Sequence, residues 1–311
     1  MGHSIGSKVS GLFILTATLR KLLSVMKLWC APAMAKIEPD GISKNRCDCL
    51  TGLCRIPNIN TRMTRTKIKR IVVISDLQVP YEDKKAVKNV AQFIRKYKPD
   101  DVLCVGDEID FQTISRWSSG RDEWSGSIGR DRDRTVQVLA ELQVQHLSRS
   151  NHSARLYNSL SKRLPGLIGL PELTIERFLR LDELGITYHH KPYQFHEDWV
   201  MVHGDEQSTK PHGGLTALEA AKRHGKSVVC GHTHRQGISS FTTASGGVLT
   251  GILTGFEVGH LMDVSKAHYT RGAFNWQQGF GIIYIDRKRV QPVAIPIEKD
   301  GSFIVEGKRL G

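Results

Sequence analysis

The chain has 311 residues, of which 40% are hydrophobic and 24% are charged, and its formal net charge is +13. This composition is typical of a globular protein and excludes a low-complexity chain. About half of the excess charge lies in residues 1–62, and most of the rest lies just after them (Arg65, Lys67, Lys69 and Arg70), so a protein that is basic over its whole surface is excluded as well.

Residues 1–62 are predicted to form a basic, non-catalytic extension. Three Lys or Arg side chains interrupt its apolar stretch, so no run approaches the roughly 20 apolar residues of a membrane span. They also argue against a signal peptide. The alternatives are an amphipathic surface helix, a disordered tail, or a natural translation start at Met63, from which a short basic lead enters a strand. We expect the folded domain to span residues 63–311.

Four of the six cysteines lie in the extension, and only Cys104 and Cys230 lie in the remainder, each inside an apolar run. Buried cysteines of this kind are typical of a reducing cytoplasm, and no secreted disulfide framework is indicated. The stretch from Cys47 to Cys54 lacks the second Cys/His pair that a zinc knuckle requires. We therefore expect a cytoplasmic protein.

From Lys69 onward, short apolar runs alternate with amphipathic stretches, which predicts an α/β layered fold. The predicted helices cover residues 83–97, 130–148, 172–183 and 214–224. The predicted strands cover residues 71–75, 102–105, 196–204 and 227–231, followed by a carboxyl-terminal third rich in strand patterning. The strand at 102–105 should pair in parallel with the strand at 71–75.

Each predicted strand ends in a side chain of a type that binds metals. These side chains are Asp76, Asp107, His203, His232 and His234. In open α/β sheets, ligands gather at the carboxyl ends of strands. A single Asp there is usually a helix cap and a single His an ordinary structural group, but five such residues at successive exits favour a shared cation site. Carboxylates with imidazoles suit Mn²⁺, Fe or Zn²⁺.

The spacing of the last two histidines indicates two ions. His232 and His234 are two residues apart, so on a strand or turn they point to different sides. Each histidine would then serve its own ion.

The ordered set of these residues with Gly106-Asp107-x-x-Asp110, Asn151-His152 and Gly231-His232-Thr233-His234 resembles the calcineurin-like metallophosphoesterase family. The resemblance covers roughly residues 70–240. The stretches SDLQVPYEDKKAV and GDEIDFQTISRW are similar to phage-encoded members, which would place the protein in the cytoplasm of a host cell. The family fold is a four-layer α-β-β-α sandwich.

The resemblance implies a role for each residue. Asp76 and His234 would bind the first metal, Asp107 would bridge both metals, and Asn151, His203 and His232 would bind the second. His152 would lie beside the substrate phosphate. The implied cofactors are two divalent ions, with Mn²⁺ preferred and Fe, Zn²⁺ or Ni²⁺ as alternatives. A hydroxide between the ions would attack phosphorus.

Two positions depart from the family pattern. The usual Asp-x-His after the first strand reads Asp76-Leu77-Gln78, so Gln78 would ligate through its amide oxygen or leave the place to water, Glu82 or Asp83. A looser first site follows. The family usually has an acidic residue directly after the Asn-His pair, and this chain has Ser153 there. No acid is therefore assigned to orient His152.

The leading functional hypothesis is a phosphoesterase that hydrolyses a small phosphodiester, such as a cyclic nucleotide or nucleotide derivative. Arg116 is a candidate phosphate clamp. The first alternative is a nuclease, which a near-neutral domain disfavours because polymer binding relies on a basic track. The second is a catalytically weakened member that binds a nucleotide or a protein, which Gln78 would favour.

Overall fold

The computed structural model describes residues 67–115, 127–266 and 274–311. The predicted extension, residues 1–62, lies outside this part of the chain, and so does Arg116. The boundary between the extension and the folded domain therefore stays a prediction.

The first sheet has six strands in the order β11-β10-β1-β2-β3-β4. Their bounds are β1 Lys69–Ile74, β2 Asp101–Cys104, β3 His146–Ser148, β4 Thr187–His189, β10 Gly279–Asp286 and β11 Arg289–Pro296. Strands β1 to β4 run parallel, as predicted for the first two, and β10 and β11 extend the sheet in antiparallel register.

The second sheet has five strands in the order β5-β6-β7-β9-β8. Their bounds are β5 Tyr193–His196, β6 Trp199–Met201, β7 Ser227–Cys230, β8 Gln236–Ser245 and β9 Val248–Val258. Strands β6, β7 and β9 are parallel, so β6 and β7 end at the same edge. A separate ribbon pairs β12 (Phe303–Val305) with β13 (Lys308–Leu310).

The helices cover the outer faces of the two sheets. Their bounds are α2 Lys84–Tyr97, α3 Ser127–Glu141, α4 Ala154–Arg163, α5 Ile175–Phe178, α6 Leu181–Leu184 and α7 Leu215–His224. Helix α2 begins where the Asp83 side chain accepts hydrogen bonds from the first backbone N–H groups, and it ends at left-handed Lys98. No helix in the described ranges has the length and apolar character to cross a bilayer.

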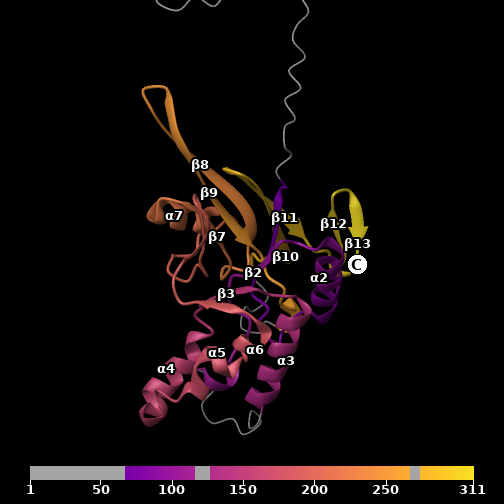
Figure 1. Ribbon diagram of the computed structural model, residues 1–311, viewed down its shortest axis with the longest axis vertical. Helices are drawn as coiled ribbons and strands as arrows, with labels where there is room; N and C mark the ends of the chain where they lie inside the picture. Colours follow the sequence, from indigo (N-terminus) through magenta and orange to yellow (C-terminus); the bar gives the residue numbers. More distant parts are fainter. Residues whose placement is uncertain (1–66, 116–126, 267–273) are drawn as a thin grey trace, which may run out of the picture. The chain divides into compact units, whose positions relative to one another are not determined.

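Alternation along β1 shows how the layers are built. Val72 and Ile74 pack against α2 and α3, whereas Ile71 and Val73 pack against the second sheet. On the other side of the second sheet, Val228 packs against the alanines of α7. The order is therefore helix, sheet, sheet, helix, which confirms the predicted four-layer α-β-β-α sandwich (Figure 1).

Two predicted helices are wrong in part. The helix predicted over residues 130–148 ends at Glu141, because Gln143 is left-handed and residues 146–148 form the short strand β3. Apolar residues continue beyond the end of the helix because Leu142, Val144 and Leu147 are all buried. They belong to a turn and a strand, however, and not to the helix.

The helix predicted over residues 172–183 is divided into α5 and α6. Left-handed Arg180 separates them, and Pro171 begins a single 3-10 turn instead of the helix. Ile175 and Leu179 are buried at a helical spacing of four residues, whereas Leu181 is buried two residues later, beyond the break.

Strands β8 and β9 form a hairpin that is buried only at its base. Phe256 near the base is fully buried, whereas Phe241, Leu249 and Ile252 nearer the tip are 44%, 59% and 56% exposed. The tip extends past the neighbouring strands (Figure 1). Packing at the base therefore carries the stabilising contacts of the hairpin.

We predict that Phe256→Ala lowers the free energy of unfolding by about 3–5 kcal/mol, because it opens a cavity between the two sheets. The matched variant Phe241→Ala should cost less than about 1 kcal/mol, since it loses mainly the exposed contact with Lys222. Chemical denaturation of both variants measures the difference. Equal losses of unfolding free energy in the two variants would show that Phe256 between the sheets contributes no more to stability than exposed Phe241.

Candidate metal centre

Five side chains that follow four strands, β1, β2, β6 and β7, form two overlapping groups. One group contains Asp107, His203 and His232, and the other contains Asp76, Asp107 and His234. Within each group the potential ligand atoms lie within 4.8 Å of one another. Asp107 belongs to both. The sequence-predicted residues therefore converge, with a single carboxylate shared between two neighbouring groups.

The backbone at these exits is strained. Asp76, Gln78, Asp107, His232 and His234 have φ angles of 51°, 47°, 54°, 67° and 57°, in the left-handed region that non-glycine residues rarely adopt. Such strain is common at functional sites, where the surrounding structure holds it. It turns each side chain out of its strand and toward the shared edge of the sheets.

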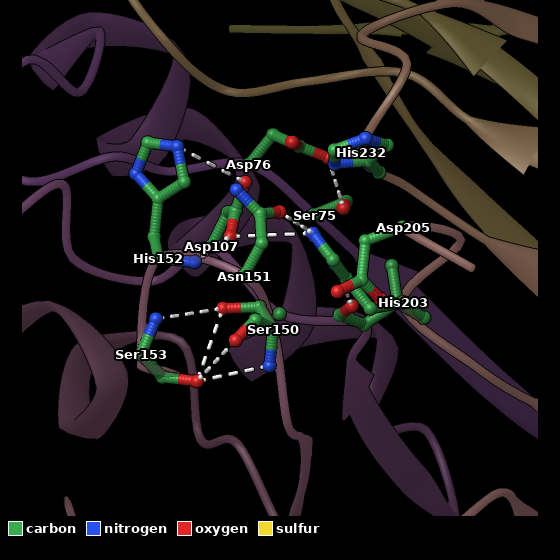
Figure 2. Close-up of polar contacts among 12 residues, drawn as sticks. Ser75, Asp76, Asp107, Ser150, Asn151, His152, Ser153, His203, Asp205 and His232 are labelled. Carbon is green, nitrogen blue, oxygen red and sulfur yellow. Dashed lines mark hydrogen bonds and ion pairs between the residues drawn. The ribbon is translucent and has the colours of Figure 1, made fainter. Parts of the chain in front are cut away.

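The ring of His203 is held in one orientation. Its Nδ1–H donates to the Val105 carbonyl over 2.8 Å. Its Nε2 lies 2.9 Å from Asn151 Oδ1 and 3.3 Å from Asp107 Oδ1, and Figure 2 shows these groups facing one another. A backbone acceptor on Nδ1 is the usual way in which a protein leaves Nε2 available for a metal.

Burial and charge act against each other in this site. Burial by itself would raise the pKa of Asp76 and Asp107, but the neighbouring imidazoles more than offset this and lower both values. Burial would likewise lower the pKa of His203, yet attraction to Asp107 and Asp76 raises it to about 10. The buried carboxylates therefore demand positive charge beside them.

Several buried polar atoms lack a hydrogen-bond partner within the described residues. They include Gln78 Oε1, His232 Nδ1 and His234 Nδ1. Buried polar atoms are normally paired, so such a concentration needs an explanation. A divalent cation supplies one, because carboxylate oxygens, an amide oxygen and imidazole nitrogens form a donor set that suits Mn²⁺, Fe or Zn²⁺. The residues present fit the two ions that the sequence predicts.

Gln78 lies beside the group that contains Asp76 and His234. It is buried, and its Nε2 is 3.0 Å from Nε2 of His234. A half-turn of the amide would place Oε1 there instead. Of the two carboxylates considered as substitutes, Glu82 pairs with Arg134 over 2.9 Å and Asp83 caps α2. Gln78 is thus the residue that the structure places beside His234.

Asp110 supplies the acid that the sequence left unassigned. His152 Nδ1 lies 3.1 Å from Asp110 Oδ1, and its Nε2 lies 2.9 Å from Nη2 of Arg155. Burial would lower the pKa of His152, but Asp107 and Asp110 raise it. The loop is held by hydrogen bonds between the Ser150 and Ser153 groups (Figure 2).

Glu257 connects the second sheet to the histidine loop. One of its oxygens accepts a hydrogen bond from the hydroxyl of Thr233, which lies between the two loop histidines. The other accepts from the backbone N–H of Thr216 at the start of α7, over 2.7 Å. The carboxylate therefore fixes the loop relative to the helix, although the sequence gives no spacing that would reveal it.

His260 is a further residue near the site to which sequence reasoning gave no role. It is fully buried, its ring centroid is 5.4 Å from that of His234, and its ring nitrogens lack a hydrogen bond among the described residues. The sequence contained a sign of this role, because β9 ends at Val258 and His260 follows two residues later. A histidine directly after a strand is the same pattern that identified the other site residues.

Gly231 is required by the close approach of β7 to the exit of β1. A Cβ at this position would overlap the Ser75 side chain and the Asp76 carboxylate. We predict that Gly231→Ala weakens Mn²⁺ binding at least about tenfold, because it displaces a ligand carboxylate. Gly129→Ala, where a Cβ meets nothing within 4 Å, should bind as wild type does. Calorimetric titration of metal-free protein makes the comparison, and equal affinities would contradict this view of the loop.

Comparison with known proteins supports the same reading. The family model of the calcineurin-like phosphoesterases matches residues 69–236, which is more than half of the chain. The Gene 54 protein of Mycobacterium phage D29 is 36% identical over 250 residues, covering 77% of this chain and 97% of the relative. The Gene 54 protein of Mycobacterium phage L5 is 34% identical over 251 residues, covering 77% and 98%.

Solved structures with a similar chain path include vacuolar protein sorting 29 from Cryptosporidium parvum, with 13% identity, a TM-score of 0.39, and coverage of 78% of this chain and 95% of that one. Another is Yfce, a phosphoesterase from E. coli, with 14% identity, a TM-score of 0.33, and coverage of 76% and 97%. The family match and the phage relatives determine the assignment. The chain belongs to the calcineurin-like phosphoesterase family.

Proposed function

We propose that the protein is a divalent-metal-dependent phosphodiesterase that acts on a phosphodiester of the nucleotide class. The observation that carries this proposal is the pair of ligand groups that share Asp107. A shared carboxylate reduces the repulsion between two neighbouring cations. Two such ions, when bound, polarise a phosphate and lower the pKa of water, so that a nucleophile exists near neutral pH.

Each ligand group has a proposed role. Asp76, Gln78 and His234 hold one ion, with Mn²⁺ preferred. His203, His232 and Asn151 hold the other, and Asp107 contacts both. Asn151 Oδ1 lies 2.9 Å from His203 Nε2. As a neutral amide it completes its shell without adding negative charge.

His152 is proposed as the general acid. Asp110 faces its Nδ1, which stabilises the imidazolium from that side. Nε2, which contacts Arg155 in the structure, would give its proton to the leaving oxygen after that oxygen takes the place of the guanidinium. The raised pKa of His152 favours the charged form near neutral pH. Asp110 itself keeps the ring oriented.

The phage relatives support action in the cytoplasm of an infected cell. A specific observation favours one second candidate, a nucleotide- or protein-binding member with little activity. This is Gln78, whose amide is a weaker ligand than the imidazole usual at that position in the family.

We predict that the protein hydrolyses bis-p-nitrophenyl phosphate with added Mn²⁺ and that EDTA abolishes the reaction. Asp107→Ala and His232→Ala should each lower the rate at least about 100-fold, because each removes a metal ligand. Asp182→Ala, at an exposed position, and His224→Ala, at a partly exposed position beside Glu206, serve as controls for the two residue types. Full activity in the ligand variants would refute the assigned site, and wild-type inactivity would favour the binding member.

We also predict that Gln78→His tightens Mn²⁺ binding at the weaker of the two sites, because an imidazole replaces an amide. Gln194→His, on exposed β5, adds a histidine away from the site and should leave both affinities unchanged. Titration calorimetry of metal-free protein separates the two binding steps. If Gln78→His leaves both Mn²⁺ affinities unchanged, as Gln194→His should, the residue at position 78 does not bind the metal.

A further inference from the structure

Beside the metal centre lies a cleft of about 360 Å³ that the activity described above does not use. Asn151 is one of the residues that line it. Helix α4 forms one wall, to which Arg155, Asn158, Lys162 and Arg163 contribute. The cleft therefore connects a proposed metal ligand with a row of basic side chains.

Arg155 of this wall pairs with Asp110 over 3.6 Å, whereas the charges of Lys162 and Arg163 are not balanced by an acid among the described residues. Between Glu141 and Glu172 the sequence contains four Arg or Lys residues and no Asp or Glu. Lys162 and Arg163 are exposed, and neither forms an ion pair with a carboxylate within the described residues. An exposed, unpaired cation lining a cleft is available for an anionic ligand.

Arg155 relates the cleft to the reacting end of the site. Its guanidinium contacts His152 Nε2 and also lines the cleft. Because His152 is proposed to protonate the leaving oxygen, the leaving group would pass Arg155 on its way out. Lys162 follows seven residues later on the same helix, about 10 Å along the axis.

We infer that the cleft binds a second phosphate, carried by the leaving group of the substrate. This inference rests on the proposed function and narrows the substrate class. The leaving group of a cyclic nucleotide or of a simple diester carries no second phosphate, so both are excluded. Two kinds of molecule share the required chemistry, a short nucleic-acid strand and a nucleoside polyphosphate.

Basic residues in the last turn of a helix also complement the helix dipole, without any ligand. Helix α2 provides the matched case, because Arg95 and Lys96 occupy its last turn just as Lys162 and Arg163 occupy that of α4. Only the α4 pair adjoins the metal centre. The variants Lys162→Ala/Arg163→Ala and Arg95→Ala/Lys96→Ala therefore remove equal charge from equivalent helix positions.

The first experiment measures binding without hydrolysis. A fluorescein-labelled oligonucleotide of eight thymidines is titrated with each protein in EDTA, and its anisotropy is followed at several salt concentrations. We expect the α4 variant to bind at least about tenfold more weakly and to lower the salt slope by about 1.4, which is the value for two phosphate contacts with a single strand. The α2 variant should bind as wild type does.

Competition then identifies the source of the phosphate. Displacement of the labelled strand by ATP at concentrations well below those of unlabelled oligonucleotide indicates a polyphosphate substrate, and the opposite order indicates a strand. Both outcomes support the inference. Equal weakening in the α2 and α4 variants, or no weakening in either, would overturn it.

The second experiment tests the cleft during turnover. Hydrolysis of a thymidine trinucleotide, which has two phosphates, is compared with hydrolysis of the dinucleotide, which has one. We expect the ratio of kcat/KM for trinucleotide to dinucleotide to fall about tenfold in the α4 variant alone. An unchanged ratio would reject the subsite while leaving the phosphodiesterase proposal intact. A wild type that hydrolyses neither compound but shows the binding difference in EDTA would reject only the phosphodiesterase proposal.

Discussion

The burial of two neighbouring carboxylates, Asp76 and Asp107, is the constraint on which the site depends. Both are essentially inaccessible to solvent, and burying a charge is costly unless an opposite charge accompanies it. Imidazoles from the second sheet provide that charge, which is why the ends of β6 and β7 must meet those of β1 and β2. The left-handed turns, the hydrogen bond from His203 to the Val105 carbonyl and the hydrogen bonds to Glu257 all hold the imidazoles beside the carboxylates. The sandwich thus holds together the ligands that its two sheets contribute separately.

The layered fold and most of the site were predictable because both depend on local patterns. Alternation along β1 assigned residues to the two faces of a sheet, and a polar residue at each strand exit indicated the shared edge. The strand β3 was not predicted because three residues carry little periodic signal. The break at left-handed Arg180 was not predicted because nothing in the spacing of apolar residues there marks the end of a helix. The contact of Asp110 with His152 depends on a loop conformation that residue spacing does not encode.

The charge of the linear sequence does not show where charged side chains meet in space. Averaged along the chain, the folded part is nearly neutral outside its first residues, and this average disfavoured a polyanionic substrate. The structure places Lys162 and Arg163 on one wall of a cleft beside Asn151, whereas their compensating acids lie elsewhere. A net charge is a sum over residues, but recognition depends on which residues face the same space.

The two ligand groups also differ in what surrounds them. The group with His203 is set in a hydrogen-bonded frame, whereas the group with His234 borders an indole, since the Trp276 ring centroid lies 4.3 Å from that of His234. The other described tryptophan, Trp199, is buried between the sheets. Ion entry beside His234 should therefore change the emission of Trp276, and the difference between wild type and Trp276→Phe separates this signal from that of the other four tryptophans of the chain. The occupancy of one half of the centre can then be followed optically without any label.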